Sequence, residues 1–162
     1  MGSGKQLAIL LSTIVASLTF AEGFPDGAPV DACVKPRPNQ PYHGQAKPQP
    51  LATNPYAVIA SAEQFQPGAQ ITVKIVGDSF KGFFLQARDV NTHEWIGSWS
   101  KTDNTVAHSE CSAITHADPR DKHQATLIWN APLNARGHVY FTGSVLKDYA
   151  TFWVDITSRV GK

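Results

Sequence analysis

The sequence predicts an all-β domain built as an antiparallel sandwich of about eight or nine short strands. Apolar and polar residues alternate through most of the chain after residue 56, which is the period of a half-buried strand. Pro, Gly, Asn and Asp separate these stretches at short intervals. No stretch of this region has the spacing of an amphipathic helix, so two packed sheets are favoured over a mixed fold.

A targeting segment comes before the domain. Lys5 gives it a positive charge, and residues 7–20 form an apolar run shorter than the roughly 20 residues that span a bilayer. Cleavage after Ala21 fits this pattern, whereas an uncleaved anchor is the alternative. We therefore expect residues 1–21 to be a signal peptide and residues 22–162 to be a single secreted domain with no membrane span.

A Pro- and Gly-rich arm, residues 22–55, begins the mature chain. Proline fixes φ and lacks an amide donor, so the arm is expected to be extended or turn-like. The two cysteines are Cys33 in the arm and Cys111 in the domain. In an oxidising compartment the simplest pairing is one disulfide, which would attach the arm to the middle of the domain. A two-cysteine metal site is the weaker alternative, because neither residue lies in a CxxC motif or a His cluster.

The strands themselves are expected at regular intervals within residues 56–158. Their ranges are 56–61, 71–77, 80–89, 94–100, 123–132, 137–146 and 151–156, with weaker candidates at 105–110 and 113–117. Turns at Pro67-Gly68, Gly77-Asp78 and Asn91 separate several of them, and Pro132 ends another because it removes a ladder donor.

Alternate apolar residues predict the face that each strand buries. The expected core sets are Ile71, Val73 and Ile75; Phe83, Leu85 and Ala87; Ala125, Leu127 and Trp129; Val139, Phe141, Gly143 and Val145; and Phe152, Val154 and Ile156.

Four stretches in this order resemble the reeler domain, also called the reelin N-terminal domain. They are GAPVDAC, FKGFFLQARD, IWNAP and GHVYFTGSVLKDYATFWV, and the resemblance covers residues 27–157. It implies an immunoglobulin-like β-sandwich. Many reeler domains carry more cysteines than the two in this chain, so the resemblance implies only the Cys33–Cys111 bridge here.

A signal peptide followed by one such domain resembles the small insect defense proteins of the noduler type. This resemblance implies a secreted hemolymph protein of innate immunity. Its expected partners are the hemocyte surface and microbial cell-surface polymers, namely lipopolysaccharide, lipoteichoic acid and β-glucan, and its expected effect is hemocyte aggregation into nodules.

Catalytic and metal-binding motifs are weak throughout the chain. There is no GxSxG elbow, and both cysteines are expected to be bridged, so no catalytic residues and no cofactor are predicted. The stretch THADPRDKH contains His116, Asp118, Asp121 and His123, but in neither zinc nor calcium-loop spacing. We expect this stretch to be a polar, solvated loop without a metal.

Two groups of residues are candidates for ligand binding. Net charge near zero gives no argument for nucleic acid, but residues 33–50 carry Lys35, Arg37 and Lys47 without an acid. These cations could approach anionic phosphates, or could belong to a solvated arm. Trp95 and Trp99 are four residues apart in the expected strand 94–100, so they are predicted to share a face and could stack on sugar rings.

Other aromatic residues leave the same choice open. Tyr140 and Trp153 lie opposite the apolar stripes of their strands and could be exposed; for all four aromatic residues the alternative is a place in the core or at a sandwich edge. The leading hypothesis is therefore a non-enzymatic immune protein that recognises microbial surfaces. A matrix module that binds host glycans or cell-surface proteins is the second hypothesis, and a secreted enzyme or metal carrier is the third.

Overall fold

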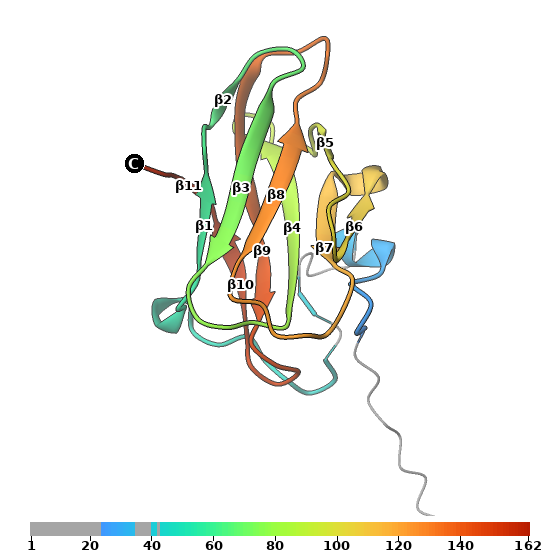
Figure 1. The fold of residues 1–162 in the computed structure, drawn as a ribbon, viewed down its shortest axis with the longest axis vertical. Helices are drawn as coiled ribbons and strands as arrows, with labels where there is room; N and C mark the ends of the chain where they lie inside the picture. Colours follow the sequence, from blue (N-terminus) through green and yellow to red (C-terminus); the bar gives the residue numbers. More distant parts are fainter. Residues whose placement is uncertain (1–23, 35–39, 42) are drawn as a thin grey trace, which may run out of the picture.

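Two β-sheets packed face to face form the body of the molecule in a computed structural model (Figure 1). The structure describes residues 24–34, 40–41 and 43–162. The predicted signal peptide, Lys35 and Arg37 lie outside these described residues. Among the described residues, no helix has the length and apolar character needed to cross a bilayer.

The first sheet has the strand order β11-β1-β3-β8-β5. Its strands are β1 (Ala57–Ala60), β3 (Gln70–Val76), β5 (Ser98–Trp99), β8 (Ala125–Asn130) and β11 (Arg159–Val160). All neighbours are antiparallel except β1 and β11, which run parallel.

The second sheet has the strand order β10-β9-β4-β7-β6 and is antiparallel. Its strands are β4 (Gly82–Asp89), β6 (Thr105–His108), β7 (Ala113–His116), β9 (Gly137–Leu146) and β10 (Phe152–Thr157), and β2 (Gln64–Phe65) pairs with the beginning of β9. Three short 3-10 helices complete the described elements: η1 (Val30–Cys33), η2 (Leu51–Thr53) and η3 (Ser109–Cys111).

The predicted all-β sandwich is confirmed, with eleven strands in the described chain instead of eight or nine. The additional strands, β2 and β11, are each two residues long, which is too short for alternation to show in the sequence. The expected strand 94–100 is mostly irregular, since only Ser98 and Trp99 form β5.

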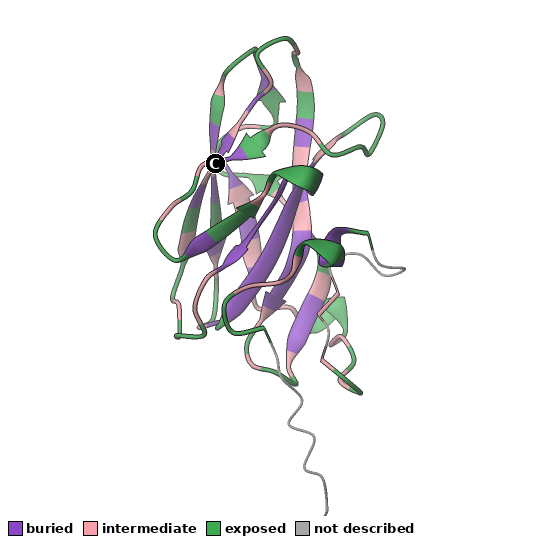
Figure 2. Cartoon of the chain, turned by 90° about the vertical axis from the view of Figure 1, so that its right-hand side faces the viewer, coloured by how far each residue is buried: buried purple, intermediate pink, exposed green. Residues whose placement is uncertain are grey.

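The core lies between the two sheets and is formed by alternate strand residues. Figure 2 shows that the buried residues are concentrated on the strands. The predicted inward residues of β3, β4 and β9 are buried there, as are Leu127 and Trp129 of β8. Trp129 is the largest fully buried side chain, and its Nε1 donates to the Ile96 carbonyl at 3.0 Å, so its polar atom is satisfied.

Strand β10 departs from the predicted alternation. Trp153 and Ile156 belong to the core, whereas Val154 is only half-buried. The pairing with β9 shifts register between Trp153 and Ile156, and Asp155 has φ of 56°. This bulge inserts a residue into the strand and reverses the faces on its two sides, so Phe152, Val154 and Ile156 do not share one face.

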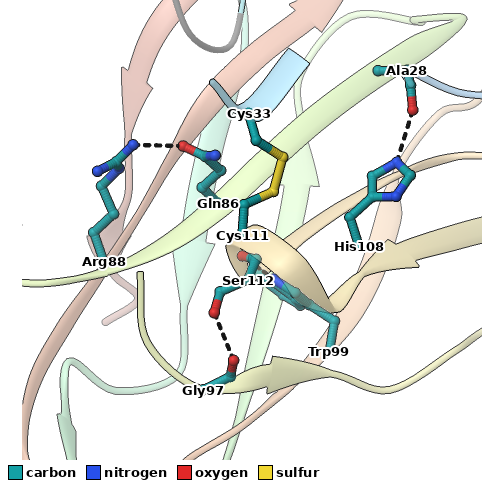
Figure 3. The surroundings of a disulfide bond; sticks show 9 residues. All are labelled: Ala28, Cys33, Gln86, Arg88, Gly97, Trp99, His108, Cys111 and Ser112. Carbon is teal, nitrogen blue, oxygen red and sulfur yellow. Dashed lines mark hydrogen bonds between the residues drawn. A yellow bond between two sulfur atoms is a disulfide. The ribbon is translucent and has the colours of Figure 1, made fainter. Parts of the chain in front are cut away.

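The outer face of the second sheet is partly covered by the N-terminal arm. The predicted disulfide is confirmed between Cys33 of η1 and Cys111 of η3, with Cα atoms 6.1 Å apart (Figure 3). Ala32, Phe84 and Ala113 pack with both cysteines in a second, smaller apolar cluster. The arm is therefore an integral layer of the domain at this end of the sheet.

Candidate binding surface

The outer face of the second sheet has one covered end and one open end. Residues paired across β4 and β9 project to the same side, so Phe84 with Ser144 and Arg88 with Tyr140 all face outward. Phe84 and Ser144 are buried at the end that the arm covers. Arg88 and Tyr140 are only half-buried, so the described residues leave this end of the face partly open.

A row of three side chains crosses the open end. Arg88 is paired with Tyr140 on one side and forms a bridge with Trp95 on the other, so the three residues lie side by side across the strands. The guanidinium carbon of Arg88 lies 5.9 Å from the centre of the Trp95 ring, which is a cation–π contact. Trp95 is 39% exposed. We call this set the Trp95–Arg88–Tyr140 row.

A tight turn after β4 places Trp95 in the row. The Asp89 carboxylate accepts hydrogen bonds from the backbone N–H groups of Asn91 at 2.7 Å and Thr92 at 3.0 Å. The bonds from Thr92 and Asn91 hold the pKa of Asp89 below its usual value. The returning chain then bonds back to β4, with Asp89 donating to Glu94 and Ile96 donating to Ala87.

Hydrogen bonds also fix the guanidinium of Arg88. Its Nη1 donates to the His93 carbonyl at 2.6 Å, and its Nη2 donates to Gln86 Oε1 at 2.9 Å (Figure 3). Nδ1 of His93 lies 2.9 Å from the Tyr140 hydroxyl. Gln86 is fully buried and its Nε2 has no hydrogen-bond partner in the structure. The row is thus held by its neighbours.

Trp99 does not belong to this surface, and the prediction that Trp95 and Trp99 share a face is wrong. Trp95 bridges to the second sheet, whereas Trp99 pairs with Trp129 in the first. Gly97, with φ of 69°, lies between them where the chain crosses from one sheet to the other. Trp99 is 7% exposed, and its Nε1 donates to the Ser112 carbonyl at 2.9 Å, so it is a core residue.

The other aromatic candidates divide in the same way. Tyr140 is half-buried in the row, as its position opposite the apolar stripe allowed. Trp153 is buried in the core, because the bulge in β10 turns it inward, and its Nε1 donates to Thr53 Oγ1 at 3.1 Å. The expectation that Trp153 could be exposed is therefore wrong.

Lys47, the basic candidate that lies within the described residues, is not at the row. Lys47 is exposed in the arm, two residues before Gln49, whose N–H donates to the Phe152 carbonyl. Phe152 is at the end of the second sheet where β4 begins, and Arg88 is near the other end of β4. Arg88 lies six positions beyond Gly82 along the strand, which corresponds to roughly 20 Å.

The stretch that contains His116 is less solvated than predicted. His116 belongs to β7 and is buried, with its Nδ1 accepting a hydrogen bond from the Phe83 N–H at 3.1 Å. Burial holds the pKa of His116 below its usual value. Hydrogen bonds from Arg120 and Lys122 lower the pKa of Asp118. In the part of the chain that the structure describes, no group of three or more His, Cys, Asp or Glu residues is placed to hold a metal.

Sequence reasoning missed Arg88 and His93. Alternation within FFLQARD does put Gln86 and Arg88 on the face opposite Leu85 and Ala87, so that signal was present. The sequence pattern does not reveal that Arg88 pairs with Trp95, because this pairing depends on the turn at residues 89–94.

The molecule is a small antiparallel sandwich with an aromatic and cationic row on one sheet face. The model of the Reeler domain matches residues 31–160, so this chain belongs to the Reeler domain family. The predicted resemblance is confirmed.

Similar proteins fall into two groups. The chain is 35% identical over 153 residues to "Putative defense protein 3" of Antheraea mylitta, and the match covers 90% of each chain. It is 30% identical over 156 residues to ferric-chelate reductase 1 of Homo sapiens, where the match covers 91% of this chain and 25% of the reductase. The chain therefore spans about a quarter of the reductase.

Among solved structures, the chain is similar to the human F-spondin reeler domain. The TM-score is 0.58 at 20% identity, and the match covers 74% of this chain and 95% of the other. This likeness supports the fold. Family membership and the relatives named as defense proteins support an extracellular, defense-type role.

Proposed function

We propose that this chain is a secreted, non-enzymatic protein of innate immunity that binds polymers on microbial surfaces. The polymers are lipopolysaccharide, lipoteichoic acid or β-glucan, and binding promotes hemocyte aggregation against bacteria in the hemolymph. In this proposal, residues 1–21 are the signal peptide and residues 22–162 are the mature domain. The similarity to an Antheraea mylitta protein with "defense" in its name, over nearly the whole of both chains, supports it.

The Trp95–Arg88–Tyr140 row is the observation that carries the proposal. An exposed indole offers a flat apolar face to the C–H groups of a sugar ring, while Arg and Tyr supply hydrogen bonds at its edges. Cleavage of a glycan would require two carboxyl groups across a cleft. The shallow hollow beside Trp95 is lined by Arg88, His93, Glu94 and Trp95, and so contains a single carboxylate. This composition supports binding without hydrolysis.

A pull-down experiment tests the proposal. Protein secreted by cells that express the full sequence would be incubated with whole bacteria, yeast glucan and washed hemocytes, at low and high salt. Retention on bacteria or glucan is expected. Retention on hemocytes alone would contradict the microbial role and favour the adhesive or matrix module that binds host surfaces.

A further inference from the structure

We propose that the Trp95–Arg88–Tyr140 row is a subsite for an uncharged pyranose unit, and that it selects neutral sugars over phosphorylated or sulfated ones. This inference rests on the proposed function, since it names the ligand class of the same surface. It assigns the binding of neutral sugar units to the open end of the second sheet, and the basic residues of the arm are not part of this subsite.

The hydrogen bonds of Arg88 limit the part of its guanidinium that an anion could use. Recognition of phosphate or carboxylate by arginine typically uses parallel N–H bonds from the guanidinium fork. One N–H group of each terminal nitrogen of Arg88 is already committed within the protein, Nη1 to His93 and Nη2 to Gln86. An anion would therefore meet only part of this fork, whereas the three remaining N–H groups can each donate to a sugar hydroxyl.

The charges around the hollow lead to the same ligand class. Arg88 contributes a positive charge, and the exposed Glu94 contributes a carboxylate to the same hollow, so their formal charges cancel. An anionic group drawn towards Arg88 would also approach Glu94. A sugar hydroxyl can donate to a carboxylate and accept from an N–H group, so it suits a hollow lined by both.

The aromatic residues supply the apolar part of the contact. Trp95 is opposite Arg88 on a segment that hydrogen bonds to β4, so its position is fixed before a ligand arrives. A fixed indole with hydrogen-bonding groups at its edge matches the apolar face and hydroxyl rim of a neutral pyranose.

Calorimetric titration with a matched pair of ligands tests this inference. The full-length secreted protein would be titrated with a soluble β-1,3-glucan oligosaccharide and with the same oligosaccharide carrying sulfate groups, at about 0.05 M and 0.5 M salt. We expect the neutral ligand to bind more tightly at both salt concentrations. Trp95→Ala should weaken its binding at least about tenfold.

Tyr149→Ala is the matched control, because Tyr149 is 38% exposed and lies outside the row. It should retain the affinity of the unmodified protein, and the thermal unfolding of Trp95→Ala should show that this variant is folded.

Two results would overturn the inference while leaving the proposed function intact. One is tight binding of the neutral glucan that Trp95→Ala does not change. The other is binding of the sulfated oligosaccharide or whole bacteria, but not of the neutral one, with an affinity that falls as salt rises. Absence of binding to both oligosaccharides and to whole bacteria would overturn the inference and the proposed function together.

Discussion

Lys122 is a mostly buried lysine whose ammonium group contacts the loop that follows β7. Its Nζ donates to the carbonyl oxygens of Lys81, Asp118 and Arg120, each at 2.8 Å, and it also pairs with the Asp118 carboxylate. The Lys122 side chain is mostly buried, and its bond to the Asp118 carbonyl is partly buried, whereas the bonds to Lys81 and Arg120 are exposed.

The Lys122→Met variant should therefore be less stable. Met retains much of the side-chain volume and leaves the carbonyl oxygens unpaired, so the free energy of unfolding should fall by about 1–3 kcal/mol. Urea denaturation measures the change. The exposed Lys74 provides the control, since Lys74→Met should alter stability by less than about 0.5 kcal/mol. Equal effects from both variants would show that the Lys122 contacts do not stabilise the fold.

His116 should make stability depend on pH. Burial, with a further contribution from the Lys122 charge, holds its pKa in the folded protein below the usual 6.5. The unfolded chain therefore binds a proton at a higher pH than the folded protein does. The free energy of unfolding should decrease as pH falls below about 6.5, because protonation favours the unfolded state.

Urea denaturation at pH 7 and pH 5 measures this dependence. His116→Asn retains an acceptor for the Phe83 N–H and does not titrate, so it should reduce the difference in stability between the two pH values. The exposed His123 serves as the control, and His123→Asn should leave the difference unchanged. A difference that persists in His116→Asn would assign the pH dependence to other groups.

The N-terminal arm and its disulfide should stabilise the domain as one element. The Cys33–Cys111 bond joins positions 78 residues apart and lies in the cluster that covers Phe84 and Ala113. Replacing both cysteines with Ser should lower the free energy of unfolding by about 2–5 kcal/mol. Urea denaturation of the variant and of the unmodified protein with and without reductant measures this. If reduction had no effect, the arm would be held by its other contacts alone.

Alternation predicted the long strands well because their inward residues face a continuous core. The range expected for β9, residues 137–146, agrees with the structure, and Val139, Phe141 and Val145 are buried as expected. The same rule failed at β10, where the bulge at Asp155 inserts a residue. A bulge depends on the partner strand, so the pattern of β10 alone did not contain it.

The candidate site was predicted only in part for a similar reason. The four-residue spacing predicted that Trp95 and Trp99 share a face, because we assumed that residues 94–100 form one continuous strand. The crossing between sheets at Gly97 separates them, and Trp95 instead joins Arg88 and Tyr140 through pairing across strands. Such neighbours are distant in sequence, and no local pattern encodes them.

At the scale of the whole molecule, two different contact surfaces are expected at opposite ends of the second sheet. The Trp95–Arg88–Tyr140 row is at one end, and the exposed Lys47 belongs to the arm that covers the other. Two separate contacts on one molecule could join two particles, which aggregation of cells requires. The row should bind neutral sugars, and the arm should add contacts to anionic polymers.

The triple variant Lys35→Ala/Arg37→Ala/Lys47→Ala should separate these contributions. It removes the cations of a segment, residues 33–50, that contains no acid. Binding to lipopolysaccharide should weaken, most clearly at low salt, since interactions between exposed charges are screened beyond about 10 Å at 0.1 M salt. Affinity for neutral β-glucan should stay the same, because the row is untouched. Binding of both polymers would be measured by surface plasmon resonance over a range of salt concentrations. Unchanged lipopolysaccharide binding in this variant would show that the arm takes no part in recognition.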